Sequence, residues 1–566
     1  MFKVDSLTKR KNNLLFKQWF NNMSTYLWYL SVIVVALLIS VPILTILTGI
    51  FSNHQEIWEH LIDTVLKDYI LNTLWLMFGV TLGVLVIGVG CAWLVTMCNF
   101  VGSRVLEWLL LMPLAAPAYI LAFSYTNMLS YFGPVQIWLR KTFGWQSIDD
   151  YWFPSIRNIW GAIAMLILVL YPYVYLLARV AFLEQSVCTL EASRSLGYNP
   201  WQSFLKVALP ASRPSIVAGL ALALMETLND FGTVQYFGVS TFTTGIYRVW
   251  FGMGERVAAA QLASFLMLFI VILIVIERLS RSHARYYQTN NSSQKLPRYN
   301  LNFFRGSIAF IACIVPVILG FIIPTVYLIN LTLNNREESL NNSFLELSRN
   351  SFILALISAF IAIIIGFFMA YGQRLIPHFI VNISVRISSM GYAIPGSVIA
   401  VGILIPLGNF DNSLDNWMMN NFNISTGLLL SGTIIGLIYA YLVRFLAVSF
   451  NTIESSLSKI KPNLDDASRS LGSSPFATLF KVHLPLMWGG ILTAIMLVFV
   501  DVLKELPATL VMRPFNFDTL AVRVYQYASD ERLIEASAPA LTIILVGILP
   551  VIILSYRIAR SRVGNH

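Results

Sequence analysis

Long apolar segments recur from one end of the chain to the other, and they limit the fold more than any other feature. A helix needs about 20 apolar residues to cross a bilayer, and only helices or closed barrels satisfy their backbone hydrogen bonds in lipid. Only 12% of the 566 residues are charged, about half the fraction usual in soluble proteins. We therefore expect an all-α polytopic membrane protein with about 12 transmembrane helices. The segments long enough to span are 27–51, 70–97, 106–132, 158–183, 213–239, 257–279, 306–333, 351–372, 384–408, 425–448, 488–512 and 533–556.

The charges between these segments are distributed unevenly. The N-terminal tail carries five basic residues against one acid, and the central polar stretch and the C-terminal tail are also basic. Segment 52–69 carries four acids and one lysine. Basic loops stay in the cytoplasm, so both termini and the central linker are expected there. This placement accounts for the net charge of +10 and gives no reason to expect a nucleic-acid partner.

A polar segment between apolar spans occurs twice, at a constant offset of 275 residues. The copies are EASRSLGYNPWQSFLKVALP (191–210) and DASRSLGSSPFATLFKVHLP (466–485). Eleven of the twenty positions are identical. With six spans in each half, the two repeats should have the same orientation in the membrane, related by an axis along the membrane normal. We therefore expect two parallel six-helix repeats.

The repeat sets the expected division of the chain. The divisions are an N-terminal cytoplasmic tail with the first transmembrane helix and an outer loop (1–67), the first repeat (68–280), a cytoplasmic linker (281–305), a seventh transmembrane helix with an outer loop (306–345), the second repeat (346–556) and a cytoplasmic tail (557–566).

Each copy of the duplicated segment predicts a helix, a turn and a second helix. Gly197 and Gly472 can adopt the left-handed conformation that ends a helix. Asn199 and Ser474 are suitable N-caps, and each is followed by a proline, which suits the first helical position. A Leu-Pro pair is expected to close each second helix. The alternative is an amphipathic helix pair that rests on the lipid surface.

The residue pattern of both copies resembles the coupling loop of type I ABC importer permeases. The matching positions are Glu191, Ala192, Gly197, Leu209 and Pro210 in the first copy, and Asp466, Ala467, Gly472, Leu484 and Pro485 in the second. Both copies have serine where the family has its second alanine, and the second copy has aspartate for glutamate. These changes retain shape and the sign of the charge. We call residues 191–210 coupling loop 1 and residues 466–485 coupling loop 2.

Other segments are similar to the fused two-repeat permeases of ferric-iron importers. They are ETLNDFGTVQYFG (226–238), DVLKELPATLVMRPFNFDTL (501–520) and YASDER (527–532). The resemblance implies the type I ABC importer permease fold in a bacterial inner membrane. It also implies a cytoplasmic ABC ATPase homodimer, a periplasmic iron-binding protein and ferric iron as cargo.

The chain lacks the motifs of an enzyme. It contains no GxxxxGK[ST] nucleotide-binding motif, no HExxH and no GxSxG. No cofactor is therefore expected in this chain, and ATP and magnesium would bind to the separate ATPase subunit. A permease for thiamine or another small solute is an alternative within the same class. A secondary transporter of the major facilitator kind, which also has two six-span repeats, is a more distant one.

Acidic residues occur at matching positions inside the fifth and eleventh expected spans. Glu226 corresponds to Asp501, and Asp230 corresponds to Glu505. The i, i+4 spacing predicts that both acids of a pair share one helix face. A charge at the helix centre costs about 2.5–3.5 kcal/mol on insertion scales, so these side chains should avoid lipid.

Two hypotheses explain these acids. If the two helices meet, four carboxylates could ring a passage for a hard cation, because such cations take oxygen ligands. Alternatively, Lys504, Arg248 or Arg523 neutralises them and locks helices together, or they serve docking at the outer mouth. Matching prolines, Pro117 and Pro395, are expected to kink their spans and are candidate hinges.

Overall fold

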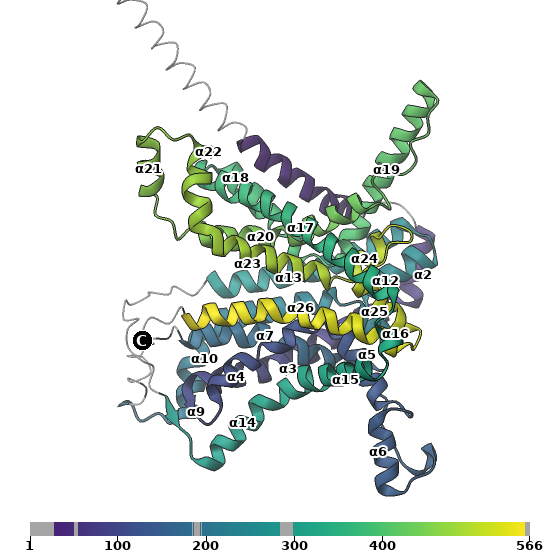
Figure 1. Ribbon diagram of the computed structural model, residues 1–566, viewed down its shortest axis with the longest axis vertical. Helices are drawn as coiled ribbons and strands as arrows, with labels where there is room; N and C mark the ends of the chain where they lie inside the picture. Colours follow the sequence, from purple (N-terminus) through teal and green to yellow (C-terminus); the bar gives the residue numbers. More distant parts are fainter. Residues whose placement is uncertain are drawn as a thin grey trace, which may run out of the picture. The chain divides into compact units, whose positions relative to one another are not determined.

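The computed structural model describes residues 28–49, 55–183, 185, 193, 195–282 and 298–560. Nearly all of them are helical (Figure 1). Eleven helices are long and apolar enough to cross a membrane, and a twelfth span results if one bent pair is counted as a span. The expectation of about 12 spans in an all-α membrane protein is confirmed. The helices are Trp28–Gly49, α3 (Leu66–Met97), α7 (Ile159–Leu183), Pro200–Asn229, α13 (Arg256–Ser282), Phe303–Asn334, α17 (Asn342–Leu375), α19 (Gly396–Phe422), α20 (Ile434–Leu457), Phe476–Leu503 and α26 (Leu533–Arg560).

The described residues form two compact units. One unit contains residues up to 45 with 352–394 and 402–502, and the other contains 46–351 with 395–401 and 503–566. These units differ from the sequence repeats, because the leading helices are exchanged and because residues 395–401 and 503–566 of the second repeat belong to the unit of the first. The helix that begins at Trp28 belongs with the second repeat, where the Tyr439 hydroxyl donates to the Leu38 carbonyl at 2.5 Å. The helix that begins at Phe303 belongs with the first repeat, where the Tyr125 hydroxyl donates to the Leu319 carbonyl at 2.6 Å.

The same helix crossing occurs in both units. In one, α3 packs along α7, and a Cβ placed on Gly88 would lie 3.0 Å from the Tyr171 carbonyl oxygen. In the other, a Cβ on Gly366 would lie 2.5 Å from the Ser449 hydroxyl. Only glycine permits such a close approach of two helices. Since Gly88 and Gly366 correspond in the two repeats, this packing confirms that the halves are built alike.

Two spans are interrupted where the sequence has proline. Helices Ser103–Ala115 and Ala118–Phe143 are bent by 90° at a break that contains Pro117. Pro395 lies between the 3-10 turn Gly391–Ala393 and α19. The expected kinks are therefore complete breaks, because the proline ring fixes φ and disfavours helix in the preceding residue.

Candidate functional site

The turn and the second helix of coupling loop 1 begin as the sequence predicts. Gly197 has a φ of +81°, and the backbone N–H of Tyr198 donates to the Ser193 carbonyl at 3.0 Å. Asn199 then caps α9 (Pro200–Ser203). Its side chain accepts from the Gln202 N–H at 2.8 Å, and the Gln202 side chain accepts from the Asn199 N–H at 3.1 Å. Glu191 and Ala192 lie outside the described residues.

Coupling loop 2 has the same geometry. Helix α21 (Asn463–Ser470) contains Asp466 and Ala467 and ends before Gly472, whose φ is also +81°. Ser474 caps α22 (Pro475–Thr478), and its hydroxyl accepts from the Ala477 N–H at 3.2 Å. The helix–turn–helix prediction is confirmed for loop 2; for loop 1 the turn and the second helix are confirmed, and most of the predicted first helix lies outside the described residues.

In each loop, a hydrogen bond between two hydroxyl groups joins the segments on either side of the turn. Ser193 lies 2.9 Å from Ser203, and Ser468 lies 2.8 Å from Thr478, oxygen to oxygen. All four side chains are buried. Ser193 and Ser468 are the positions where the chain has serine in place of the family's alanine, so each departure supplies a hydrogen bond.

The tips of both loops expose large apolar side chains. Leu196 is 75% exposed and Leu471 is 87% exposed. Trp201 and Phe476, which begin the second helices, are 66% and 43% exposed. Exposed aromatic and aliphatic side chains on a polar loop are typical of protein contact surfaces. The two loops therefore present similar surfaces.

The Leu-Pro pairs do not close the second helices, which corrects that prediction. Phe204–Ala208 and Leu479–His483 are π-helical turns, and α10 (Leu209–Asn229) and α23 (Leu484–Leu503) continue directly from them. The N–H of Leu209 bonds to the Phe204 carbonyl. A π-turn accommodates a proline because the locally rearranged ladder tolerates a missing donor. Each coupling loop is thus continuous with a membrane helix.

The support beneath the loops differs. Under coupling loop 2, the Arg374 Nε donates to an Asp465 carboxylate oxygen at 2.8 Å, and its other nitrogens donate to the Leu457 and Ile460 carbonyls at 2.7 and 2.9 Å. The fully buried His483 lies 2.6 Å from the other Asp465 oxygen. The corresponding residues of the first repeat are Thr96, Leu190 and Ala208. Thr96 and Ala208 are uncharged, and Leu190 lies outside the described residues.

Aromatic packing also differs between the supports. Trp28, at the start of the first described helix, has its ring centroid 5.2 Å from that of Phe476 and 5.4 Å from that of Tyr371. Under loop 1, Trp93 packs on Phe204 at 4.8 Å. The N-terminal helix therefore contacts coupling loop 2 directly.

The prediction that each acid pair shares one helix face is wrong. Helix α10 ends at Asn229 and α23 ends at Leu503, so Asp230 and Glu505 lie beyond them. Each carboxylate instead caps the short helix that follows. Asp230 accepts from the N–H groups of Thr233 and Val234 at 3.0 and 3.1 Å.

Glu505 makes the matching contacts at the second break. It accepts from the N–H groups of Ala508 and Thr509, both at 2.9 Å. The short helices are α11 (Gly232–Tyr236) and α24 (Pro507–Met512). Capping bonds outweigh helix continuity here because a carboxylate can satisfy two or more orphan N–H groups at once.

These two capped breaks lie against one another inside one unit. A Cβ on Gly232 would lie 2.8 Å from both the Leu506 and the Tyr119 side chains. Helices α11, α24 and α5 (Ala118–Leu129) therefore converge there. The participation of α5 was not predicted from the sequence, since the three helices come from distant segments.

Glu226 and Asp501 remain within α10 and α23, and both are half-buried. Asn229, which the sequence reasoning missed, donates to Glu226 at 3.3 Å and accepts from the Gly396 N–H at 2.9 Å. This bond fixes the end of α10 to the residue after Pro395. Arg523, a predicted partner of the acids, instead lies 3.3 Å from Asp518.

No group of three or more histidine, cysteine, aspartate or glutamate side chains is close enough to hold a metal ion in the part of the chain that the structure describes. The carboxylates of Asp230 and Glu505 already serve as caps. The ring of four acids stays a prediction.

Comparison with known proteins identifies the family. The family described as "binding-protein-dependent transport system inner membrane component" matches residues 84–286 and 362–563. The Fe(3+)-transport system permease protein FbpB 2 of Haemophilus influenzae is 25% identical over 493 residues, which cover 86% of this chain and 90% of that protein. The putative ferric transport system permease protein FbpB 1 of the same organism is 24% identical over 75% of this chain and 66% of that protein. The sulfate transport system permease protein CysT of Escherichia coli is 31% identical over 27% of this chain and 51% of that protein.

The two matched ranges contain both coupling loops and both capped helix breaks. They cover most of the chain and contradict the major-facilitator alternative. The chain belongs to the family of binding-protein-dependent transport system inner membrane components, and it is a fused ABC transporter permease that carries the family's unit twice.

Proposed function

We propose that this chain is the permease subunit of an ATP-driven importer that moves ferric iron from the periplasm to the cytoplasm. A periplasmic iron-binding protein would deliver the cargo, and a cytoplasmic ATPase homodimer would bind coupling loops 1 and 2. Both termini and the linker would then lie in the cytoplasm, as the basic residues of these segments indicate.

The observation that carries the proposal is the matched geometry of the two coupling loops. Both have a turn glycine at +81° and the same exposed apolar tip. Both continue into a membrane helix through a π-turn. Two equal contacts are what a two-fold partner requires. A continuous helix would transmit movement of that partner to the capped breaks at Asp230 and Glu505.

The similarity to ferric transport permeases supports iron as cargo. The acids near the helix breaks suit a hard cation, which prefers oxygen ligands. The partial similarity to a sulfate permease supports a second candidate, another small solute such as an oxyanion. Thiamine remains a further alternative of the same class.

Purification from native membranes, followed by uptake measurements, tests the proposal. We expect an ATPase and an iron-loaded binding protein to co-purify with the chain. Cells that lack the chain should lose uptake of radioactive ferric iron and keep uptake of sulfate and thiamine. Loss of sulfate or thiamine uptake with normal iron uptake would refute the iron assignment. Absence of any ATPase from the complex would refute the importer assignment.

A further inference from the structure

A polar pocket of about 610 Å³ opens at the end of α26 away from the C-terminus. It lies within one compact unit, between the start of α17 on one side and α25 (Leu520–Ser529) with the segment that joins it to α26 on the other. None of the described residues that line it has an aliphatic side chain. The lining residues are Asn341, Ser343, Arg523, Tyr525, Gln526, Tyr527, Ser529, Asp530 and Arg532.

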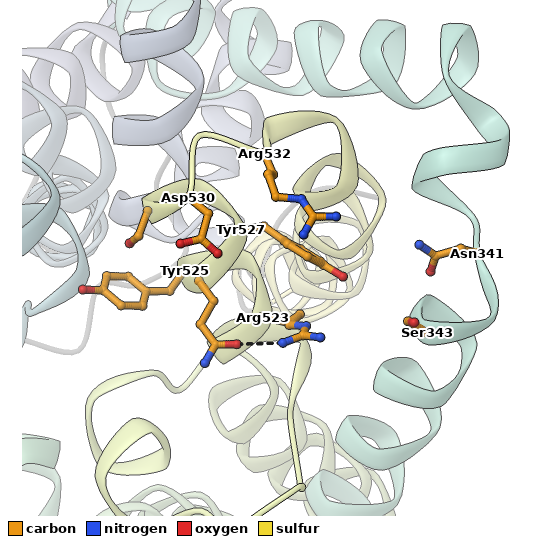
Figure 2. Close-up of a pocket in the computed structure, with 9 residues that line it drawn as sticks. Asn341, Ser343, Arg523, Tyr525, Tyr527, Asp530 and Arg532 are labelled. Carbon is orange, nitrogen blue, oxygen red and sulfur yellow. Dashed lines mark hydrogen bonds between the residues drawn. The ribbon is translucent and has the colours of Figure 1, made fainter.

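Two guanidinium groups converge on this pocket. Arg523 and Arg532 lie 5.0 and 5.2 Å from the centre of the Tyr527 ring, and Figure 2 shows them flanking that ring. Asn341 and Ser343 face them from the opposite wall (Figure 2). Both guanidinium groups therefore lie beside one ring and in the wall of one pocket, where an anion would be attracted by both charges.

The neighbouring acids leave donors of both arginines available. Arg523 shares Asp518 with Arg513, and one of its terminal nitrogens also donates to the Gln526 side chain at 3.1 Å. Its Nε is buried and has no hydrogen-bond partner among the described residues. Arg532 uses two nitrogens on Glu535, at 2.8 and 2.9 Å. A guanidinium has five N–H donors, so each arginine can still bind a ligand.

The first repeat does not contain this site. Arg523 corresponds to Arg248, but Tyr525, Gln526 and Tyr527 correspond to Trp250, Phe251 and Gly252. Arg532 directly precedes α26, whereas Glu255 directly precedes α13, and the next residue, Arg256, lies 6.0 Å from the centre of the Trp250 ring. The common fold of the two repeats explains why both have an arginine at the position of Arg523. It does not explain the hydroxyl and amide groups that line this pocket, which are the features of a specific polar site.

We propose that this pocket binds a small oxyanion of the phosphate or polycarboxylate class. Guanidinium groups match the paired oxygens of such anions, and the hydroxyl of Ser343 and the amide of Asn341 would bind their remaining oxygens. The pocket is large enough for a polycarboxylate with several oxygen groups. Asp530, the one acid of the lining, opposes two arginines and weakens anion binding. The site does not depend on iron being the cargo.

Binding to the purified full chain in lipid nanodiscs tests the proposal. We expect phosphate or citrate to bind with a dissociation constant of about 1 mM or below. Either anion should raise the unfolding temperature of the chain more than chloride does at equal ionic strength. Arg523→Gln and Arg532→Gln should each weaken binding by about tenfold or more, because each removes charge-assisted hydrogen bonds. Arg532→Lys should retain part of the affinity, since it keeps the charge but not the planar fork.

Two further variants separate this site from general charge effects. Asp530→Asn should strengthen oxyanion binding, whereas a cation site would be weakened by it. Lys141→Gln removes an exposed charge in α6 (Pro134–Phe143), outside the pocket, and should leave affinity unchanged. The proposal is overturned if chloride acts as strongly as phosphate and citrate, or if both arginine variants bind as the unaltered chain does. Iron transport is not measured, so the result is independent of the cargo assignment.

Discussion

Coupling loops 1 and 2 have nearly the same surface and different supports. Each has a left-handed glycine and a buried hydroxyl pair. Loop 2 rests on an arginine–aspartate pair, a buried histidine and the N-terminal helix, whereas loop 1 has Thr96 and Ala208 at two of these positions. The contact surface is duplicated where an identical partner would bind. The residues that support this surface need only to hold it in place, so they can differ between the two loops.

The largest expected effect comes from the turn glycines. Proline fixes φ near −65°, which is incompatible with the +81° of Gly197 and Gly472. We expect Gly197→Pro and Gly472→Pro each to reduce uptake more than about tenfold, because the distorted tip would no longer engage the ATPase; one decade corresponds to about 1.4 kcal/mol. Uptake and ATPase co-purification measure the effect at equal membrane levels.

Gly144→Pro is the matched control for these variants. Gly144 also has a positive φ and open space around it, but it follows α6, outside the coupling loops. Uptake should stay normal in this variant. Equal loss in all three would mean that strain rather than loop contact causes the defect.

The supports differ most at Arg374. Arg374→Gln leaves the Asp465 carboxylate without its cation, which should destabilise coupling loop 2 by about 2–3 kcal/mol, below the range for fully buried pairs because both side chains keep some exposure. Limited trypsin cleavage after Lys459 in membrane vesicles should become faster. Thr96→Val changes the corresponding position of the first repeat and should not affect that rate. Unchanged cleavage after Arg374→Gln would mean that the ion pair does not support the loop.

Substitution of the four acids tests separately whether they stabilise the helix breaks and whether they lie on the cargo path. Asp230→Asn and Glu505→Gln retain an oxygen that can cap the following helix, so stability should change by less than about 1 kcal/mol. If the carboxylates lie on the cargo path, each variant, together with Glu226→Gln and Asp501→Asn, should reduce iron uptake several-fold at equal expression. Undiminished uptake in all four would remove these acids from the path.

The smallest effect is expected for the hydroxyl pairs. Ser193→Ala and Ser468→Ala each remove one hydrogen bond, worth about 1 kcal/mol, and restore the family's alanine. Both should lower the unfolding temperature slightly and by similar amounts, with uptake nearly unchanged. A large effect in one loop only would show that the loops are less alike than their geometry indicates.

Local sequence signals predicted part of the site correctly. The turn at Gly197, the Asn199 cap and the Pro200 start depend on neighbours within a few residues, so their chemistry can be read from the chain. The acids were misassigned because their i, i+4 spacing fits a helix equally well. Only the N–H groups of the following short helices showed that the spans end at Asn229 and Leu503.

The membrane spans, their duplication and the turns of the coupling loops can be read from the amino-acid sequence alone, because the length of an apolar segment and the φ of a glycine are local properties. The tertiary structure decided which repeat receives each leading helix, that Arg374 pairs with Asp465 across 91 positions of the chain, and that Asn341 faces Arg523 across a pocket. Such contacts depend on how distant helices pack. That packing is selected by the combined burial and hydrogen bonding of many residues, which no short segment specifies.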